Sequence, residues 1–215
     1  MRYEERIPGD RPRCLLLQPT ARHEAPALDA ELAAIVAAAQ APLAAGLLHV
    51  DDWDVDLMPW PDRKISRDER AGHCAGQTLQ FIREEVLPRH PGIPVILGGY
   101  SLAGLFALWA ATQCDAFAAV AAASPSLWIE GWVPFAREHA PRTREVYLSL
   151  GDREETAKNA AIARVGDCVR AQHELLCGQL GPEHCTLVWE QGGHFSDNAG
   201  RLARAFAWCL GQLGL

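Results

Sequence analysis

Short apolar runs alternate with longer amphipathic stretches along almost the whole chain. The runs carry few charges, which is typical of strands buried on both faces of a parallel sheet. We expect such strands at residues 14–18, 46–50, 94–98, 116–123, 145–150 and 185–190. Pro19 directly follows the first run, and we expect it to end that strand because proline cannot donate to a sheet ladder.

The stretches between these runs have apolar residues at helical spacing. Residues 26–41 show it clearly, with Leu28, Leu32, Ile35 and Val36 on one face and Pro42 at the end. Further helices are predicted at 73–87, 102–113, 159–180 and 197–213, and a loop at 51–68. Alternating strands and helices predict an α/β fold with a mainly parallel sheet of at least six strands and helices on both faces. We expect one domain over residues 1–215.

A serine stands between the third predicted strand and the helix that follows it. The segment Gly98–Leu105 reads GGYSLAGL, with Ser101 in the middle. This arrangement resembles the nucleophile elbow of the α/β-hydrolases, in which a tight turn exposes the serine above the sheet. Positions two before and two after the serine must be small, and they are Gly99 and Ala103, where the usual motif has two glycines. The alternative is that Ser101 only caps the helix.

The α/β-hydrolases carry their catalytic residues in the chain order serine, acid, histidine. Of the later histidines, only His194 directly follows a predicted strand, after Gly192 and Gly193. His184 precedes that strand, so it should lie at the opposite end of the sheet, and His139 lies in a polar stretch. We therefore predict His194 as the base.

The acid should follow the predicted strand at 145–150. That loop reads Gly151-Asp-Arg-Glu-Glu, and in this fold the acid often stands three residues after a glycine. This spacing favours Glu154 as the acid, with Asp152 as the alternative and Glu155 as the third candidate. Any of the three carboxylates could instead be a solvated loop charge.

Four segments together resemble the Putative esterase family, which includes esterase D-like, feruloyl and siderophore esterases. They are Gly99–Leu105, Ser124-Pro-Ser-Leu-Trp128, Gly151–Glu154 and Gly193-His194. Their order and spacing cover roughly residues 12–212. The resemblance implies a compact α/β-hydrolase fold and hydrolysis of carboxylic esters by a serine. Because some siderophore esterases use a Ser–His pair, it also implies that the acid is not always essential.

The expected reaction is acyl transfer through a covalent serine ester. The backbone N–H of Leu102 should be one oxyanion donor, and the second should come from the loop after the first strand. Pro19 has no N–H, so Thr20 or Ala21 is the candidate there. Trp53, Trp128 and Tyr100 are candidates for contacts with substrate, although core packing is an equal alternative for each. Residues 124–144 leave room for a small flap and no large cap domain.

The charge and hydropathy of the chain argue against some classes of binding partner. The formal net charge is -7 and there is no basic stripe, which argues against nucleic acid as a partner. No apolar run approaches the ~20 residues that span a bilayer, and residues 1–6 lack the apolar core of a signal peptide. We therefore expect a cytoplasmic protein that does not bind membranes and acts on a small-molecule ester.

The cysteines give little support for a metal site. There are 7, none at CxxC spacing, and the His-Cys pairs at 73–74 and 184–185 are sequence neighbours, which rarely bind one ion together. We expect reduced, buried thiols and no cofactor or metal. Two other functions remain open at this point: an acyltransferase or thioesterase using the same triad, and a non-catalytic binding protein of this fold.

Overall fold

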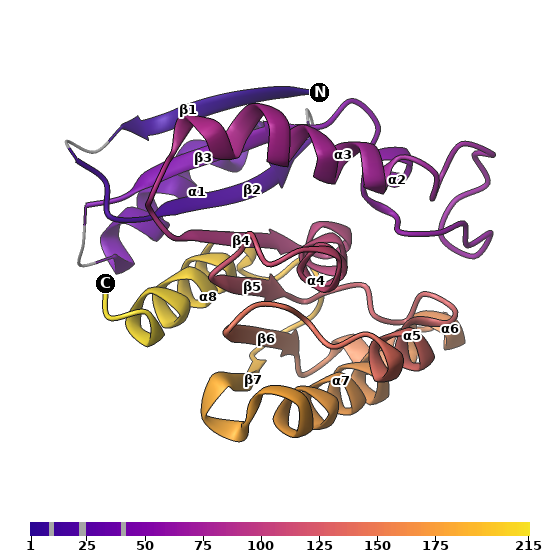
Figure 1. The fold of residues 1–215 in the computed structure, drawn as a ribbon. Helices are drawn as coiled ribbons and strands as arrows, with labels where there is room; N and C mark the ends of the chain where they lie inside the picture. Colours follow the sequence, from indigo (N-terminus) through magenta and orange to yellow (C-terminus); the bar gives the residue numbers. More distant parts are fainter. Residues whose placement is uncertain (9–10, 22–24, 40–41) are drawn as a thin grey trace.

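The computed structural model describes residues 1–8, 11–21, 25–39 and 42–215, and a seven-stranded sheet forms its centre (Figure 1). The strand order is β1-β3-β2-β4-β5-β6-β7. Neighbouring strands from β3 to β7 are parallel, and β1 is antiparallel to β3. The mainly parallel sheet is therefore confirmed. The strands are β1 (Arg2–Pro8), β2 (Leu15–Thr20), β3 (Ala44–His49), β4 (Val95–Tyr100), β5 (Ala119–Ala123), β6 (Glu145–Gly151) and β7 (Cys185–Glu190).

Strand β1 was not predicted from the sequence. Its residues include Arg2, Glu4 and Arg6, which alternate with Tyr3 and Glu5, so no apolar run marks it. Charged residues are typical of an edge strand, because they discourage pairing with another chain. Arg2 and Arg6 both form ion pairs with Glu4, and the Tyr3 hydroxyl lies 2.7 Å from a ring nitrogen of His90.

Pro19 lies inside β2 and does not end it, so that prediction was wrong. The Leu15 N–H donates to Pro94 O, so alternate residues Leu15, Leu17 and Pro19 point their backbone groups toward β4. Pairing with β4 ends at Leu17, opposite Leu97. Proline therefore costs no ladder hydrogen bond at its position, and β2 continues beside β3 to Thr20.

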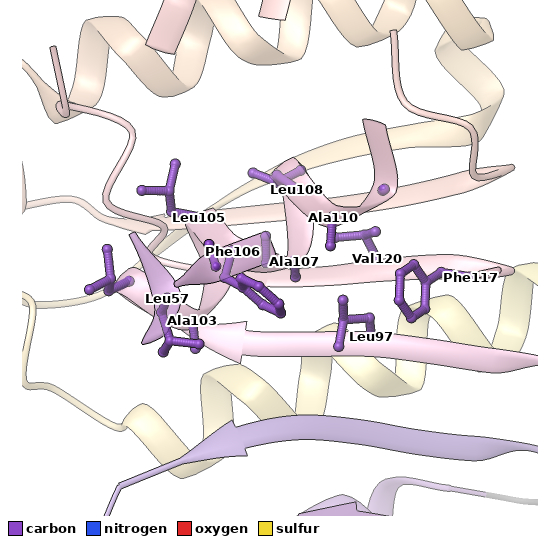
Figure 2. Packing of buried hydrophobic residues seen from close by; sticks show 14 of the residues in the cluster. Leu57, Leu97, Ala103, Leu105, Phe106, Ala107, Leu108, Ala110, Phe117 and Val120 are labelled. Atoms are coloured by element: carbon purple, nitrogen blue, oxygen red, sulfur yellow. The ribbon is translucent and has the colours of Figure 1, made fainter. Parts of the chain in front are cut away.

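Two groups of helices cover the two faces of the sheet, as the sequence predicts. Helices α1 (Ala25–Ala38) and α8 (Asn198–Gln212) contact each other on one face, while α3 (Ala75–Phe81), α4 (Leu102–Gln113) and α7 (Val165–Leu180) pack on the other. Alternation along the strands divides the core: Leu97 and Val120 face α4, and Ile96 and Ala121 face α8. Figure 2 shows Phe106 and Ala107 of α4 packed near Leu97 and Val120.

Several predicted helices differ in detail. The helix predicted at 73–87 is α3 followed by a π-helical turn (Ile82–Val86) and a 3-10 turn (Leu87–Arg89) that contains Pro88. The one predicted at 159–180 breaks at Arg164 into α6 (Ala160–Ala163) and α7. Short helix α2 (Trp53–Leu57) lies in the predicted loop. Residues 124–144 contain only α5 (Trp132–Glu138), in agreement with a small flap. No helix among the described residues has the length and apolar character needed to cross a bilayer.

Candidate active site

The turn between β4 and α4 places Ser101 in a strained conformation above the sheet. Its φ is 57° and its ψ is -117°, a region that a side chain with a Cβ rarely occupies. A Cβ on Gly99 would lie 2.5 Å from the Cβ of Ala103, so the two positions meet across the turn. Because only one of them must lack a side chain, alanine is accommodated at 103.

Three strand ends bring a serine, a histidine and a carboxylate into one hydrogen-bonded row. His194 Nε2 lies 3.0 Å from Ser101 Oγ, and His194 Nδ1 lies 2.7 Å from Glu154 Oε2. These residues follow β4, β7 and β6 respectively, and parallel strands place their carboxyl ends at the same edge. The row has the geometry in which a histidine can take a proton from a serine while a carboxylate holds the ring.

The Glu154 carboxylate is almost fully buried, with 4% of its side chain exposed. Its Oε1 accepts hydrogen bonds from the Gly151 N–H and the Ser124 hydroxyl, each at 2.8 Å. Burial by itself would raise the pKa of Glu154, but the hydrogen bonds from His194, Gly151 and Ser124 together with the His194 charge outweigh it and lower the pKa. The carboxylate is therefore ionised at neutral pH.

Arg201 is a site residue that the sequence analysis missed. It lies in α8, its side chain is fully buried, and its Nη1 donates to Glu154 Oε1 at 3.0 Å. The same nitrogen lies 3.0 Å from Ser124 Oγ and 3.1 Å from the Tyr100 hydroxyl. Arg201 therefore supplies a positive charge behind the carboxylate that holds the histidine.

The other end of the guanidinium holds the histidine loop. Arg201 Nη2 donates to the carbonyls of Gln191 and Gly193, each at 3.2 Å. A sequence signal for this role exists, because Arg201 falls on the face of α8 that buries Leu202 and Ala205. A charged residue on the apolar face of a helix is almost never fully buried unless it is paired.

The alternatives to Glu154 have other partners. Asp152 Oδ1 accepts the Gly192 N–H at 2.8 Å, and Glu155 forms an ion pair with Arg170 at 2.7 Å. Asp152 thus shapes the histidine loop, whereas Glu155 faces α7. The structure brings Glu154, and not these two carboxylates, to the ring of His194.

The other histidines considered lie away from the serine. His184 pairs with Glu145 at 2.9 Å, at the amino ends of β7 and β6, which is the opposite end of the sheet as expected. His139 caps α5, and its ring stacks on Phe135. Only His194 contacts Ser101 among the described histidines.

A cavity of about 330 Å³ opens beside Ser101. Its walls are mainly apolar, and Phe195, 89% exposed, stands at its edge next to His194. The lining residues come from the loops after β4, β5, β6 and β7 and from α6 and α7: Ser101, Ser124, Pro125, Ser126, Trp128, Arg153, Glu154, Ala157, Ile162, Val165, His194 and Phe195.

Of the three residues predicted to contact substrate, only Trp128 lines this cavity. Tyr100 lies behind the histidine: its hydroxyl donates to His194 O at 2.7 Å, and the two ring centroids are 5.4 Å apart. Trp53 lies in α2, where it packs against the hydrophobic core, and is not part of the cavity wall. The loop position of a tryptophan did not reveal whether it faces the sheet or the site.

The residues expected to supply the oxyanion donors follow the ends of β4 and β2. Leu102 is the first residue of α4, where a backbone N–H has no partner within the helix. Thr20 ends β2, and its carbonyl accepts the Val50 N–H at 3.2 Å, so the backbone groups of Thr20 point toward β3 and away from β4. Ala21 follows it and is buried. Both lie at the carboxyl edge of the sheet, as does Ser101.

Comparison with known proteins identifies similar sequences and folds. The sequence profile of the family described as Putative esterase matches residues 47–196, more than half of the chain. An IroE-like serine hydrolase from Shewanella oneidensis has a TM-score of 0.72 at 16% identity, over 96% of this chain and 74% of its own. The siderophore hydrolase EstB from Aspergillus nidulans has a TM-score of 0.69 at 20% identity, over 94% of this chain and 86% of its own. The enterobactin esterase FES from Shigella flexneri has a TM-score of 0.65 at 16% identity, over 99% of this chain and 60% of its own. A search of curated proteins found no match.

Proposed function

Because the chain belongs to the Putative esterase family of carboxylic ester hydrolases, we propose that Ser101, His194 and Glu154 form its catalytic triad. The observation that carries this proposal is the hydrogen-bonded row from Ser101 Oγ through His194 to Glu154, which opens directly on the cavity. The fold resemblance to solved hydrolases supports the placement of such a row at the carboxyl edge of the sheet.

In the proposed reaction, Ser101 Oγ attacks the carbonyl carbon of the ester. Its proton passes to His194 Nε2 over the 3.0 Å hydrogen bond, and the imidazolium then donates it to the leaving alkoxide. The alcohol departs and the acyl group stays on Ser101. Water, deprotonated by His194, releases the acid and restores the serine. Glu154 holds Nδ1–H and stabilises the imidazolium with its negative charge.

The tetrahedral intermediate carries a negative oxygen that needs donors in place before the reaction. The Leu102 N–H at the start of α4 is the first donor in this proposal, and the Ala21 N–H after β2 is the second, because the backbone groups of Thr20 point toward β3. The positive end of α4 adds to their effect. Removal of one such donor typically costs about 10²–10³ in rate.

We propose small-molecule esters with an apolar acyl or aryl group as substrates. Trp128, Ile162 and Phe195 give the cavity its apolar wall, while Arg153 adds one positive charge at its rim. A volume of about 330 Å³ falls within the range of small-molecule sites. The short flap at 124–144 leaves the site without a large cap, which suits a bulky alcohol part.

The proposal is tested by labelling with a fluorophosphonate, peptide mapping and hydrolysis of a short p-nitrophenyl ester. The wild type should be labelled on Ser101, and Ser101→Ala should lose both labelling and turnover. Ser126→Ala is the matched control, because its hydroxyl lies only 3.2 Å from Ser101 Oγ and lines the same cavity. This variant should still be labelled on Ser101.

Labelling of Ser126 in place of Ser101, or equal turnover by the wild type and Ser101→Ala, would contradict the proposal. Addition of a small alcohol during turnover separates hydrolysis from acyl transfer. A hydrolase releases mainly the free acid, whereas an acyltransferase would form the new ester.

A further inference from the structure

We propose that His173, Cys177 and Cys185 bind a thiophilic divalent metal ion, Zn²⁺, with two thiolates and one imidazole as ligands. The site is separate from the proposed triad, and its two cysteines do not have CxxC spacing. A histidine and a cysteine four residues apart on one helix share a face, and the second cysteine comes from the following strand.

The turn between α7 and β7 creates the cluster. Helix α7 ends at Leu180 and is followed by Gly181, whose φ of 103° suits glycine. A 3-10 turn (Pro182–His184) then returns the chain to Cys185 at the start of β7. Helix α7 then packs along β7 (Figure 1). This places the two cysteine sulfurs 3.3 Å apart and His173 Nε2 3.7 Å from Cys177 Sγ.

The distances between the ligand atoms are near those that a tetrahedral zinc ion requires. Zinc–sulfur bonds of about 2.3 Å and zinc–nitrogen bonds of about 2.0–2.1 Å require about 3.8 Å between two sulfurs and about 3.6 Å between sulfur and nitrogen. The observed separations are 3.3 Å and 3.7 Å, and all three ligand atoms lie within 4.8 Å of one another. Small side-chain rotations therefore suffice for binding.

The surroundings of the cluster favour a cation. The carboxylates of Glu183 and Glu145 interact electrostatically with Cys185, so a positive charge at the cluster would be attracted to them. Coordination to a metal ion deprotonates a thiol, and the charge of the ion offsets the repulsion between two neighbouring thiolates.

Among the described residues the cluster supplies three ligands, so a tetrahedral zinc ion would have one coordination position left for water. The site lies at the amino end of β7, whereas His194 follows the carboxyl end of the same strand. Zinc here would join α7 to β7 and act on stability, with no contact to the reacting ester.

The test uses protein purified with a thiol reductant, freed of metal with a chelator, and titrated with Co²⁺ and then Zn²⁺. The wild type should bind one equivalent of Co²⁺ with a thiolate-to-cobalt absorption band, which Zn²⁺ displaces. Zinc should also raise Tm. Cys177→Ser and His173→Ala should weaken binding by at least about tenfold, since even loss of an outer-shell partner costs 10–100-fold.

Cys74→Ser is the matched control, because Cys74 is also partly exposed but precedes α3, away from the cluster. It should bind metal as the wild type does. Unchanged ester hydrolysis by Cys177→Ser would show that this variant is folded. The proposal is overturned if the wild type shows no thiolate-to-cobalt band, if Cys177→Ser binds equally well, or if mass spectrometry finds Cys177 and Cys185 disulfide-linked in the reductant-purified protein.

Discussion

Replacement of Arg201 by methionine would test whether a buried cation holds the candidate site together. The change removes a guanidinium whose side chain is fully buried and leaves the Glu154 carboxylate, 4% exposed, without that counter-charge. It also removes the donors to the carbonyls of Gln191 and Gly193. Methionine fills much of the space, so the effect reports the lost charge and hydrogen bonds more than a cavity.

Loss of one partner of a buried ion pair typically costs about 3–5 kcal/mol of unfolding free energy. For a chain of this size each 1 kcal/mol lowers Tm by about 2–4 °C, so Arg201→Met should lower Tm by about 6–20 °C. Ester hydrolysis measured at 25 °C should also fall, since the loop that carries His194 loses two of its hydrogen bonds.

Arg204→Met is the matched control for differential scanning calorimetry. Arg204 lies one turn further along α8 and forms ion pairs with Glu190 and Asp197, but 48% of its side chain is exposed. Exposed pairs contribute about 0–1 kcal/mol, so this variant should lose at most a few degrees in Tm.

The double variant Arg201→Met/Glu154→Gln tests whether the stability lost in Arg201→Met comes from the unpaired Glu154 charge. Because both charges are then absent, it should be more stable than the sum of the two single effects implies, with a coupling of about 0.5–3 kcal/mol. Strict additivity, or a loss for Arg201→Met no larger than that for Arg204→Met, would show that the buried charge pair does not stabilise the site.

Three further outcomes are expected. The wild type should be more stable than Glu154→Gln, and this difference in unfolding free energy should be constant above about pH 4.3, the ordinary glutamate pKa. The difference should shrink as the pH falls from there through the lowered folded-state pKa of Glu154. A pH series of urea titrations measures it, and a difference that grows in acid would refute the prediction. Glu154→Gln should lower kcat by up to about 10⁴-fold, as an amide does in place of a triad carboxylate. Asp152→Asn should have little effect, because asparagine keeps an Oδ1 that can accept the Gly192 N–H, and equal losses in the two variants would contradict the assignment. Gly99→Ala should lower the unfolding free energy by about 1–3 kcal/mol or more, because the new Cβ would lie 2.5 Å from the Cβ of Ala103. An unchanged Tm would show that the turn can relax.

The sequence predicted the parallel sheet because local patterns specify it, and local patterns also mark the candidate site residues after β4, β6 and β7. An apolar run followed by a glycine-rich turn marks Ser101 as a candidate nucleophile without knowledge of distant residues. Glu154 was preferred over Asp152 on spacing alone, and the structure brings Glu154 to His194. What decides between them is the direction of each side chain, which depends on the turn at Gly151 and on Arg201.

Features that depend on tertiary contacts were not predictable in the same way. Strand β1 is defined by its partner β3 and not by an apolar pattern, and Pro19 could continue β2 only because pairing with β4 ends before it. The role of Arg201 requires α8 to lie behind three strand ends at once. The cluster of His173, Cys177 and Cys185 combines a helix face with the start of a strand, so the spacing of the cysteines along the chain does not reveal it.

The backbone at Ser101 also has a consequence for how this chain can change over evolutionary time. A serine at a φ of 57° and a ψ of -117° costs on the order of 1–3 kcal/mol, whereas glycine adopts such angles with little penalty. Selection for folding alone would therefore favour glycine at this position. A lineage with no use for the hydroxyl would therefore gain stability by losing it.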